Sequence, residues 1–328
     1  MNYSIGIDLG GTNIKAVVVQ PDGTVIIRKH LPFDPSIPMD WAHKSKALVQ
    51  EIEREQNQAP NSIGVAAPGL ASVDGRSIAH MPGRLEGLEN LEWRKFLGFR
   101  RKVPVLNDAH AALLGEWWLG GARGFRNAIL LTLGTGVGGA ILADGKLWLG
   151  TINRAGHLGH VSVDPQGRPD IAKTPGSLED EIGNWTVGRR SQGRFTTTRD
   201  LVAAHIGGDP EATGLWMKSI RSLAASIASF INILDPEAVI IGGGIAQAGS
   251  ALFDPLRKFL DEMEWRPGGH QVNILPAELG EFAGAFGSAR HALDRARRSP
   301  DPSSPLSPST NTGPMLADLA PDKGHTAG

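Results

Sequence analysis

Three glycine-rich turns, each placed directly after a short apolar segment, constrain the fold of this chain more than any other feature. They occupy residues 8–12, 134–139 and 242–246. The whole chain has 42 glycines among its 328 residues. Glycine lets backbone N–H groups approach an anion closely, and a turn of such groups forms an anion-binding nest. One such turn is weak evidence, but three after three apolar strands favour a protein that grips a nucleotide.

The first turn carries polar side chains beside its glycines, Gly10 and Gly11. Asp8 ends the preceding apolar segment and can hold Mg²⁺ through water, while Thr12 and Lys15 can contact phosphate. A plain glycine hairpin turn is the alternative interpretation of this segment taken alone.

The other two turns differ from the best-known nucleotide motifs. The second lacks the Lys-Ser/Thr pair of a Walker phosphate loop, and it opens a hairpin, which disfavours a dinucleotide-binding fold. The third lies between a strand and a helix, where a nucleotide can pack against bare backbone. The candidate residues are Gly134, Thr135 and Gly136 in the second turn and Gly242, Gly243 and Gly244 in the third.

The patterning around these turns alternates between strand and helix periods, which predicts α/β architecture with largely parallel sheets. Residues 4–12 also resemble residues 128–136, which suggests two similar halves facing each other across a cleft. We expect strands at 4–9, 15–20, 24–30, 62–67, 103–106, 128–133 and 238–241, a hairpin at 137–148, and helices at 41–57, 109–119 and 211–234.

Asn107 and Asp108 stand where a strand ends and a helix begins. The structural interpretation is a helix N-cap, a position that both residue types favour. The functional interpretation is a carboxylate at the carboxyl end of a strand, facing the cleft, where it can accept a hydroxyl proton during phosphoryl transfer.

Composition excludes several classes of protein. The 33 basic and 34 acidic residues give a net charge of -1, which removes the general electrostatic drive toward nucleic acid or anionic membrane. The absence of cysteine excludes disulfides, thiolate nucleophiles and cysteine-bound zinc. No apolar run approaches the roughly 20 residues that span a bilayer, and no basic region marks a signal peptide, so we expect a soluble, cytoplasmic protein. Residues 299–328 are rich in proline and small polar residues, and we expect a disordered tail there.

As a set and in this order, the segments 8–12, 107–108, 134–139, 156–160 and 242–246 resemble the ROK group of sugar kinases and sugar-responsive repressors. The resemblance runs from about residue 4 to 295. It implies the actin-like, ribonuclease H-like ATPase fold, in which two α/β domains flank a cleft. Residues 1–115 plus 284–298 would form one domain, and residues 116–283 the other.

The same resemblance implies a role for each segment. Residues 8–12 and 134–136 would hold the phosphates of ATP, with Mg²⁺ near Asp8, and residues 242–246 would hold the adenosine. Asn107 and Asp108 would bind sugar hydroxyls, with Asp108 as the general base. Gly69 belongs to a further matching segment near the sugar.

The first departure from the family concerns the sugar. The family usually reads Gly-Glu-x-Gly-His, where the glutamate and the histidine both contact the sugar, whereas this chain keeps His160 and has His157 in place of the glutamate. A carboxylate only accepts hydrogen bonds from hydroxyls, whereas a neutral imidazole offers one donor and one acceptor. We therefore expect altered sugar selectivity. A His157 that merely fills space in its loop is the alternative.

The second departure concerns the zinc segment of the family. Asp170, Ala172 and Ser177 stand at its three cysteine positions, whereas Glu179, which matches a sugar-binding carboxylate, is retained. The family's zinc site is therefore impossible here, although that zinc also orients the conserved histidine. We expect a hydrogen bond from Asp170 or Ser177 to replace it. A rebuilt metal site of His157, His160 and Asp170 is the alternative, and for Glu179 the alternative is a surface charge at a helix start.

A third departure follows the segment that contains Gly69. The family often reads Pro-Asn-Leu where this chain reads Met81-Pro82-Gly83-Arg84 and then continues with extra residues. A sugar-contacting asparagine is lost there, and Arg84 is expected nearby.

Together these residues predict an ATP-dependent hexose kinase that phosphorylates a primary hydroxyl, at position 6 for glucose or a related sugar. A non-catalytic sugar sensor is one alternative, but its usual N-terminal helix-turn-helix domain has no room before a strand that starts at Ser4. A kinase that uses polyphosphate as donor is another. The resemblance also implies a homodimer or homotetramer.

Overall fold

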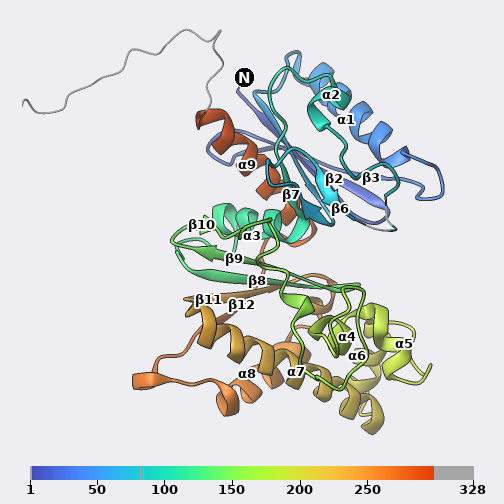
Figure 1. Ribbon diagram of the computed structural model, residues 1–328, viewed down its shortest axis with the longest axis vertical. Helices are drawn as coiled ribbons and strands as arrows, with labels where there is room; N and C mark the ends of the chain where they lie inside the picture. Colours follow the sequence, from blue (N-terminus) through green and yellow to red (C-terminus); the bar gives the residue numbers. More distant parts are fainter. Residues whose placement is uncertain (1, 82, 84, 299–328) are drawn as a thin grey trace, which may run out of the picture.

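Two five-stranded sheets, one above the other, organise the computed structural model (Figure 1). The structure describes residues 2–81, 83 and 85–298; the predicted tail at 299–328 and the predicted position of Arg84 lie outside the described residues. The upper sheet has the order β3-β2-β1-β4-β7 and the lower sheet β10-β9-β8-β11-β12. The upper strands are β1 (Ser4–Leu9), β2 (Asn13–Val19), β3 (Val25–Pro32), β4 (Ser62–Ala67) and β7 (Val105–Asn107). The lower strands are β8 (Ala128–Leu133), β9 (Val137–Ala143), β10 (Lys146–Leu147), β11 (Ala238–Gly242) and β12 (Asn273–Pro276).

Helices separate the strands, and a small ribbon of β5 (Leu70–Ala71) and β6 (Ile78–His80) lies apart from both sheets. The helices beside the upper sheet are α1 (Asp40–Gln56), α2 (Trp93–Leu97) and α9 (Ala283–Arg298), and α3 (Asp108–Leu119) lies between the two sheets. Those of the lower half are α4 (Leu178–Ile182), α5 (Val187–Arg190), α6 (Thr198–Ile206), α7 (Pro210–Leu234) and α8 (Ser250–Met263).

The prediction of largely parallel sheets is wrong for half of each sheet. In the upper sheet β1 pairs antiparallel with β2 but parallel with β4, and the lower sheet repeats this division around β8. The reason is the turns themselves, because a glycine turn of a few residues can only join antiparallel neighbours, whereas the helical crossovers return the chain in parallel. The shared strand order supports the predicted pair of similar halves.

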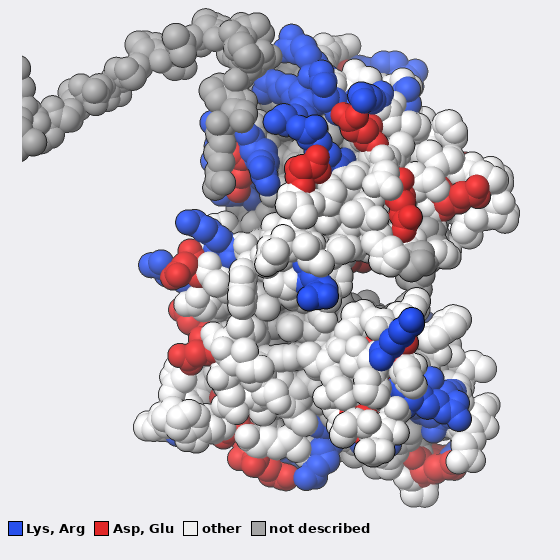
Figure 2. Space-filling model, viewed as in Figure 1, with Lys and Arg blue, Asp and Glu red and all other residues white. Residues whose placement is uncertain are grey.

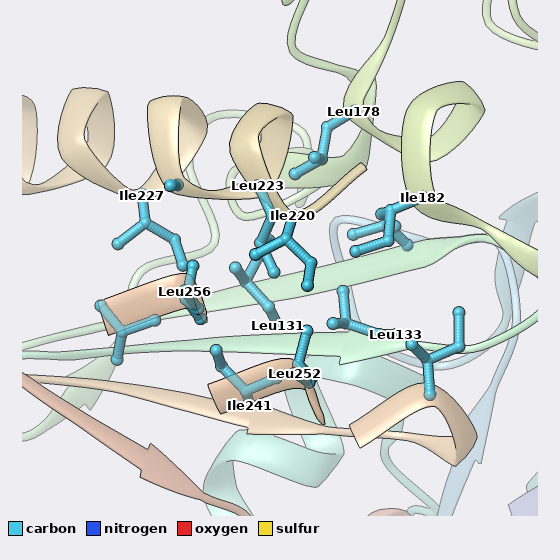
Figure 3. Packing of buried hydrophobic residues seen from close by; sticks show 14 of the residues in the cluster. Leu131, Leu133, Leu178, Ile182, Ile220, Leu223, Ile227, Ile241, Leu252 and Leu256 are labelled. Carbon is cyan, nitrogen blue, oxygen red and sulfur yellow. The ribbon is translucent and has the colours of Figure 1, made fainter. Parts of the chain in front are cut away.

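The lower half is held by the largest apolar cluster of the molecule, shown in Figure 3. Helix α7 presents Ile220, Leu223 and Ile227 at helical spacing to the sheet, where they meet Leu131 of β8 and Ile241 of β11. Each fully buried aliphatic side chain contributes about 1.5–3 kcal/mol relative to exposure. This packing covers one face of the lower sheet. The two glycine turns follow β8 and β11 and therefore lie at the ends of these strands, at the edge of the sheet.

Helices α3 and α9 cross where the two halves meet, and glycines allow their backbones to touch. A Cβ atom at Gly287 would lie 1.6 Å from the Ala111 carbonyl oxygen, and one at Gly115 would lie 2.3 Å from the Ala283 carbonyl oxygen. At the end of α3, the fully buried carboxylate of Glu116 accepts hydrogen bonds from the N–H groups of three residues, which satisfies its charge. The donors are Gly121 (2.8 Å), Glu278 (3.0 Å) and Leu279 (2.8 Å).

Within the described part of the chain, no helix combines the length and the apolar character that crossing a bilayer requires.

Candidate active site

The junction between β7 and α3 carries the predicted catalytic carboxylate. Asn107 caps α3: its side-chain oxygen accepts from the N–H groups of Ala109 (2.9 Å) and His110 (3.3 Å), and its amide nitrogen donates to the Gly69 carbonyl (3.0 Å). Asp108 follows with an exposed side chain, whose Oδ1 accepts from the Ala109 N–H at 2.8 Å. The structural interpretation of Asn107 is therefore confirmed, and the cap also joins the Gly69 segment to Asp108.

Asp8 lies at the end of β1, next to the start of α9. A Cβ atom at Gly284 would lie 2.7 Å from the Asp8 carboxylate. Burial and then the negative charge of Asp108 raise the pKa of Asp8 to about 7, against the lowering effect of Lys15. Negative charge of this kind favours a cation near Asp8, and carboxylate oxygens are preferred Mg²⁺ ligands.

This raised pKa makes a prediction about stability. Between the ordinary pKa of 3.8 and about 7, folded Asp8 keeps a proton that the unfolded chain has released, so its contribution to the free energy of unfolding falls as pH rises. Asp8→Asn should therefore become more stable relative to wild type from pH 4 to 7, with little further change above pH 8. Denaturant unfolding of both proteins without Mg²⁺ measures this. The exposed Asp144→Asn is the control, and an identical pH profile for Asp8→Asn and wild type would contradict it.

Lys15 lies opposite Asp8 in the β1–β2 pair, and its Nζ is 4.0 Å from a carboxylate oxygen of Glu281. The predicted phosphate-binding lysine is thus beside the first turn, with carboxylates on two sides.

Glu179 contacts the second glycine turn. The carboxylate of Glu179 accepts from the Val137 N–H at 2.9 Å, and a Cβ atom at Gly136 would lie 2.1 Å from it. A Cβ atom at Gly138 would lie 3.1 Å from the Cβ of Ala109, the residue after Asp108. The start of α3 at Asp108 is therefore close to both the Asp8 turn and the second turn. Figure 2 shows the surface hollowed between the two halves, on the side of β6 and α4.

The second and third turns line one pocket of about 830 Å³. This volume falls in the range of small-molecule sites. Residues from α6 and from the segment before it complete the wall. The lining residues are Gly134, Thr135, Asn184, Thr197, Thr198, Arg199, Asp200, Val202, Ala203, Ile206, Gly244, Ile245, Gln247 and Ala248.

The wall from Asn184 and α6 was missed by the sequence reasoning. Asn184 binds both sides of the pocket: its N–H donates to the Gly134 carbonyl (2.9 Å), and its side-chain oxygen accepts from the Thr198 N–H (2.7 Å). Thr197 caps α6 by accepting from the Asp200 N–H (3.1 Å). The Thr-Thr-Thr-Arg-Asp run was a readable capping signal, but nothing in it indicates which turn the helix faces.

The glycines of the predicted nucleotide turns fall into two groups. Gly243 has φ +86°, and a Cβ atom there would lie 2.3 Å from the Leu133 carbonyl oxygen, so the fold itself requires it. At Gly11, Gly134 and Gly244 neither a positive φ nor a neighbouring atom within 4 Å demands glycine. Gly11, Gly134 and Gly244 therefore leave open space for a ligand, and nucleotide binding at these three positions stays a prediction.

A hydrogen bond to Asp170 orients His160 in this chain, which has no zinc cysteines. Its Nδ1 lies 2.7 Å from Oδ2 of Asp170, so Asp170 makes the predicted replacement bond. Ser177 does not contact His160 in this way: its hydroxyl oxygen caps α4 by accepting from the Asp180 N–H, and the hydroxyl also hydrogen-bonds to Asp170. Among the described residues no three His, Asp or Glu side chains are placed to hold a metal ion, so the alternative of a rebuilt metal site is not assembled.

The side chain of His157 is half-buried in its loop. Burial, followed by the charges of His110, His160 and Arg154, lowers its pKa to about 4. Its ring packs edge-on against His110 with centroids 5.9 Å apart, and its Nε2 is buried without a hydrogen-bond partner in the described structure. These contacts favour the space-filling alternative, while a sugar contact by His157 stays a prediction.

Comparisons with known proteins agree on one family. Residues 4–295 match the family described as the ROK family. The chain is 29% identical over 338 residues to a glucokinase of Streptomyces coelicolor, covering 92% of this chain and 99% of that protein. It is 30% identical over 298 residues to an N-acetylmannosamine kinase of Escherichia coli O7:K1, covering 88% and 98%.

Solved structures show the same architecture. A ROK hexokinase from Thermus thermophilus superposes with a TM-score of 0.78 at 27% identity, covering 90% of this chain and 99% of that one. A ROK family glucokinase from Streptomyces griseus, solved in complex with glucose and AMPPNP, gives 0.71 at 26% identity, covering 89% and 100%. The two mixed sheets are therefore those of the actin-like ATPase fold, as predicted.

Proposed function

The chain belongs to the ROK family, and from that premise we propose that it is an ATP-dependent hexose kinase with Asp108 as its general base. The observation that carries this proposal is that the second and third glycine turns line one pocket, while the charge of the exposed Asp108 carboxylate acts on Asp8 of the first turn, in a protein similar to kinases of glucose and of N-acetylmannosamine.

In the proposed reaction the sugar lies beside Asn107 and Asp108, between the two predicted domains. Asp108 accepts the proton of the 6-hydroxyl as that oxygen attacks the γ-phosphorus in line, and ADP leaves. The N–H groups of the Gly11 and Gly134 turns stabilise the charge that develops on the phosphoryl oxygens. The Asp8 carboxylate would hold Mg²⁺ through water, and Mg²⁺ would neutralise phosphate charge when bound.

The donor is proposed to be ATP rather than polyphosphate because of the pocket behind the second turn. A polyphosphate chain needs only the phosphate turns, whereas a nucleoside needs a further cavity of its own. The open Gly244 and the α6 wall supply one. A structure of a similar glucokinase holds AMPPNP, an ATP analogue.

A coupled ADP-release assay tests the proposal over glucose, mannose, fructose, glucosamine and their N-acetyl forms. We expect turnover on at least one sugar. ATP binding without phosphorylation of any sugar would contradict the kinase proposal and favour a sugar sensor.

Filling the pocket should separate the two donors. Ala203 lines the pocket on α6 with an exposed side chain, so Ala203→Trp should raise the KM for ATP roughly tenfold or more, a loss of about 1.4 kcal/mol in binding. The KM for the sugar should change little. Ala225→Trp, at an exposed position of α7 outside the pocket, is the matched control. An unchanged KM for ATP would mean that the adenosine binds elsewhere, and faster turnover with polyphosphate than with ATP would reverse the donor assignment.

A further inference from the structure

A fully buried carboxylate holds the imidazole of His160. The Asp170 side chain has no exposed surface, while the His160 side chain remains 28% exposed. Oδ2 of Asp170 lies 2.7 Å from Nδ1 of His160, and its Oδ1 accepts from the N–H groups of Ala172 and Thr174, both at 2.8 Å. The carboxylate is therefore fixed by its own loop and cannot turn away from the histidine.

This contact determines which ring nitrogen carries hydrogen. Burial raises the pKa of Asp170, but hydrogen bonds from His160, the Thr174 backbone and Ser177 outweigh it and hold the pKa below its ordinary value. An ionised carboxylate has no hydrogen to donate, so Nδ1 must be the donor. In the neutral ring, Nε2 is then a bare acceptor, and it is the nitrogen left for a ligand.

The short turn that contains His160 lies close to the second glycine turn. His160 ends the short turn at Leu158–His160, and a Cβ atom at Gly159 would lie 2.0 Å from the Val137 carbonyl oxygen. The N–H of Val137 is the group bound by Glu179. The turn that carries His160 thus packs directly on the strand that begins at the second glycine turn.

We propose that Asp170 is a positioning residue that fixes His160 in the Nδ1–H form, so that Nε2 accepts a hydrogen bond from one hydroxyl of the acceptor sugar. The proposal rests on the proposed function for the identity of the ligand. The proposal makes a claim about sugar selectivity: the ring position of the sugar that faces Nε2 must carry a hydrogen-bond donor. A substituent that can only accept, such as fluorine or an ether oxygen, leaves Nε2 unpaired.

Deoxy and deoxyfluoro forms of the best sugar substrate test this polarity. At one ring position both analogues should raise the KM to a similar extent, roughly tenfold or more, because neither can donate to Nε2. In His160→Ala this loss at that position should disappear. A fluoro analogue that binds much better than the deoxy analogue at the position sensitive to His160 would show that Nε2 donates, and would overturn the proposal.

Variants of Asp170 test the positioning. Asp170→Ala should raise the KM for the sugar roughly tenfold while the KM for ATP stays within about twofold, and Asp170→Asn, whose amide oxygen can still accept from Nδ1, should restore part of this loss. In a His160→Ala background Asp170→Ala should add nothing. Asp164→Ala, an exposed residue of the same loop, is the control. Additive effects of Asp170→Ala and His160→Ala would show that Asp170 does not act through His160.

Nitrogen-15 NMR of the histidine rings gives a readout that does not depend on turnover. The signals lost in His160→Ala should report an Nδ1–H ring in the wild type and a changed tautomer in Asp170→Ala. A wild-type Nε2–H ring would overturn the proposal even if the enzyme is active. An Nδ1–H ring in a protein that phosphorylates no sugar would support the positioning while contradicting the kinase function.

Discussion

Asp108→Asn is expected to lower kcat by roughly 10²-fold or more, because the variant cannot accept the proton of the attacking hydroxyl. Asparagine has nearly the shape of aspartate, and its oxygen can still accept from the Ala109 N–H as Oδ1 of Asp108 does. The cap made by Asn107 is untouched, so α3 should begin in the same place. Turnover is measured by coupled ADP release, and ATP binding by calorimetry should remain close to that of wild type.

Asp254→Asn is the matched control, since Asp254 is an exposed carboxylate on α8 in a surface ion pair with Arg257. It should leave kcat unchanged. Near-normal turnover in Asp108→Asn would remove Asp108 from the role of base. A large loss of ATP binding in that variant would instead assign it a role in holding the donor.

Gly287→Ala is expected to destabilise the protein by on the order of 3 kcal/mol, and to lower activity as well. The added Cβ would meet the Ala111 carbonyl oxygen at 1.6 Å and the backbone N of Gly115 at 2.9 Å, and these are backbone atoms of α3 that cannot rotate aside. The helices must therefore move apart. Because α3 begins at Asp108 and Gly284 of α9 packs on Asp8, this displacement changes the spacing of both carboxylates.

Gly214→Ala is the control because Gly214 also lies inside a helix, but in open space and without a positive φ. There the added methyl group should stabilise the helix by about 0.5–1 kcal/mol. Denaturant unfolding of both variants measures the contrast. Equal stability of Gly287→Ala and wild type would show that the helices do not approach as closely as described.

Much of the fold could be predicted because it follows local rules. The strands at 4–9, 62–67 and 128–133 were predicted to the residue, since apolar runs bounded by glycine or turn residues have few alternatives. The predicted cap at Asn107 is confirmed for the same reason. Parallel pairing was overestimated, because alternation of strands and helices does not show which strands are joined by a tight turn.

The candidate site was predicted less evenly. The glycine turns could be found from their local sequence, and their order along the chain matches that of the family. The residue type does not show whether a given glycine is required by the fold or leaves open space for a ligand. Gly243 and Gly244 illustrate this: they are adjacent, but the fold requires glycine at 243 and leaves open space at 244. The roles of these residues in binding stay predictions.

By itself, the sequence determined which groups are available: three glycine turns, a carboxylate at the start of α3, and no cysteine with which to hold zinc. Only the tertiary structure decided which of them meet. Asp170 and Ser177 were equal candidates for His160 until the loop was folded, and the α6 wall of the pocket had no signal linking it to Gly134. The physical reason is that a hydrogen bond or a pocket depends on distances between residues far apart in the chain, and packing sets those distances, whereas residue type sets only what each group can do when it arrives.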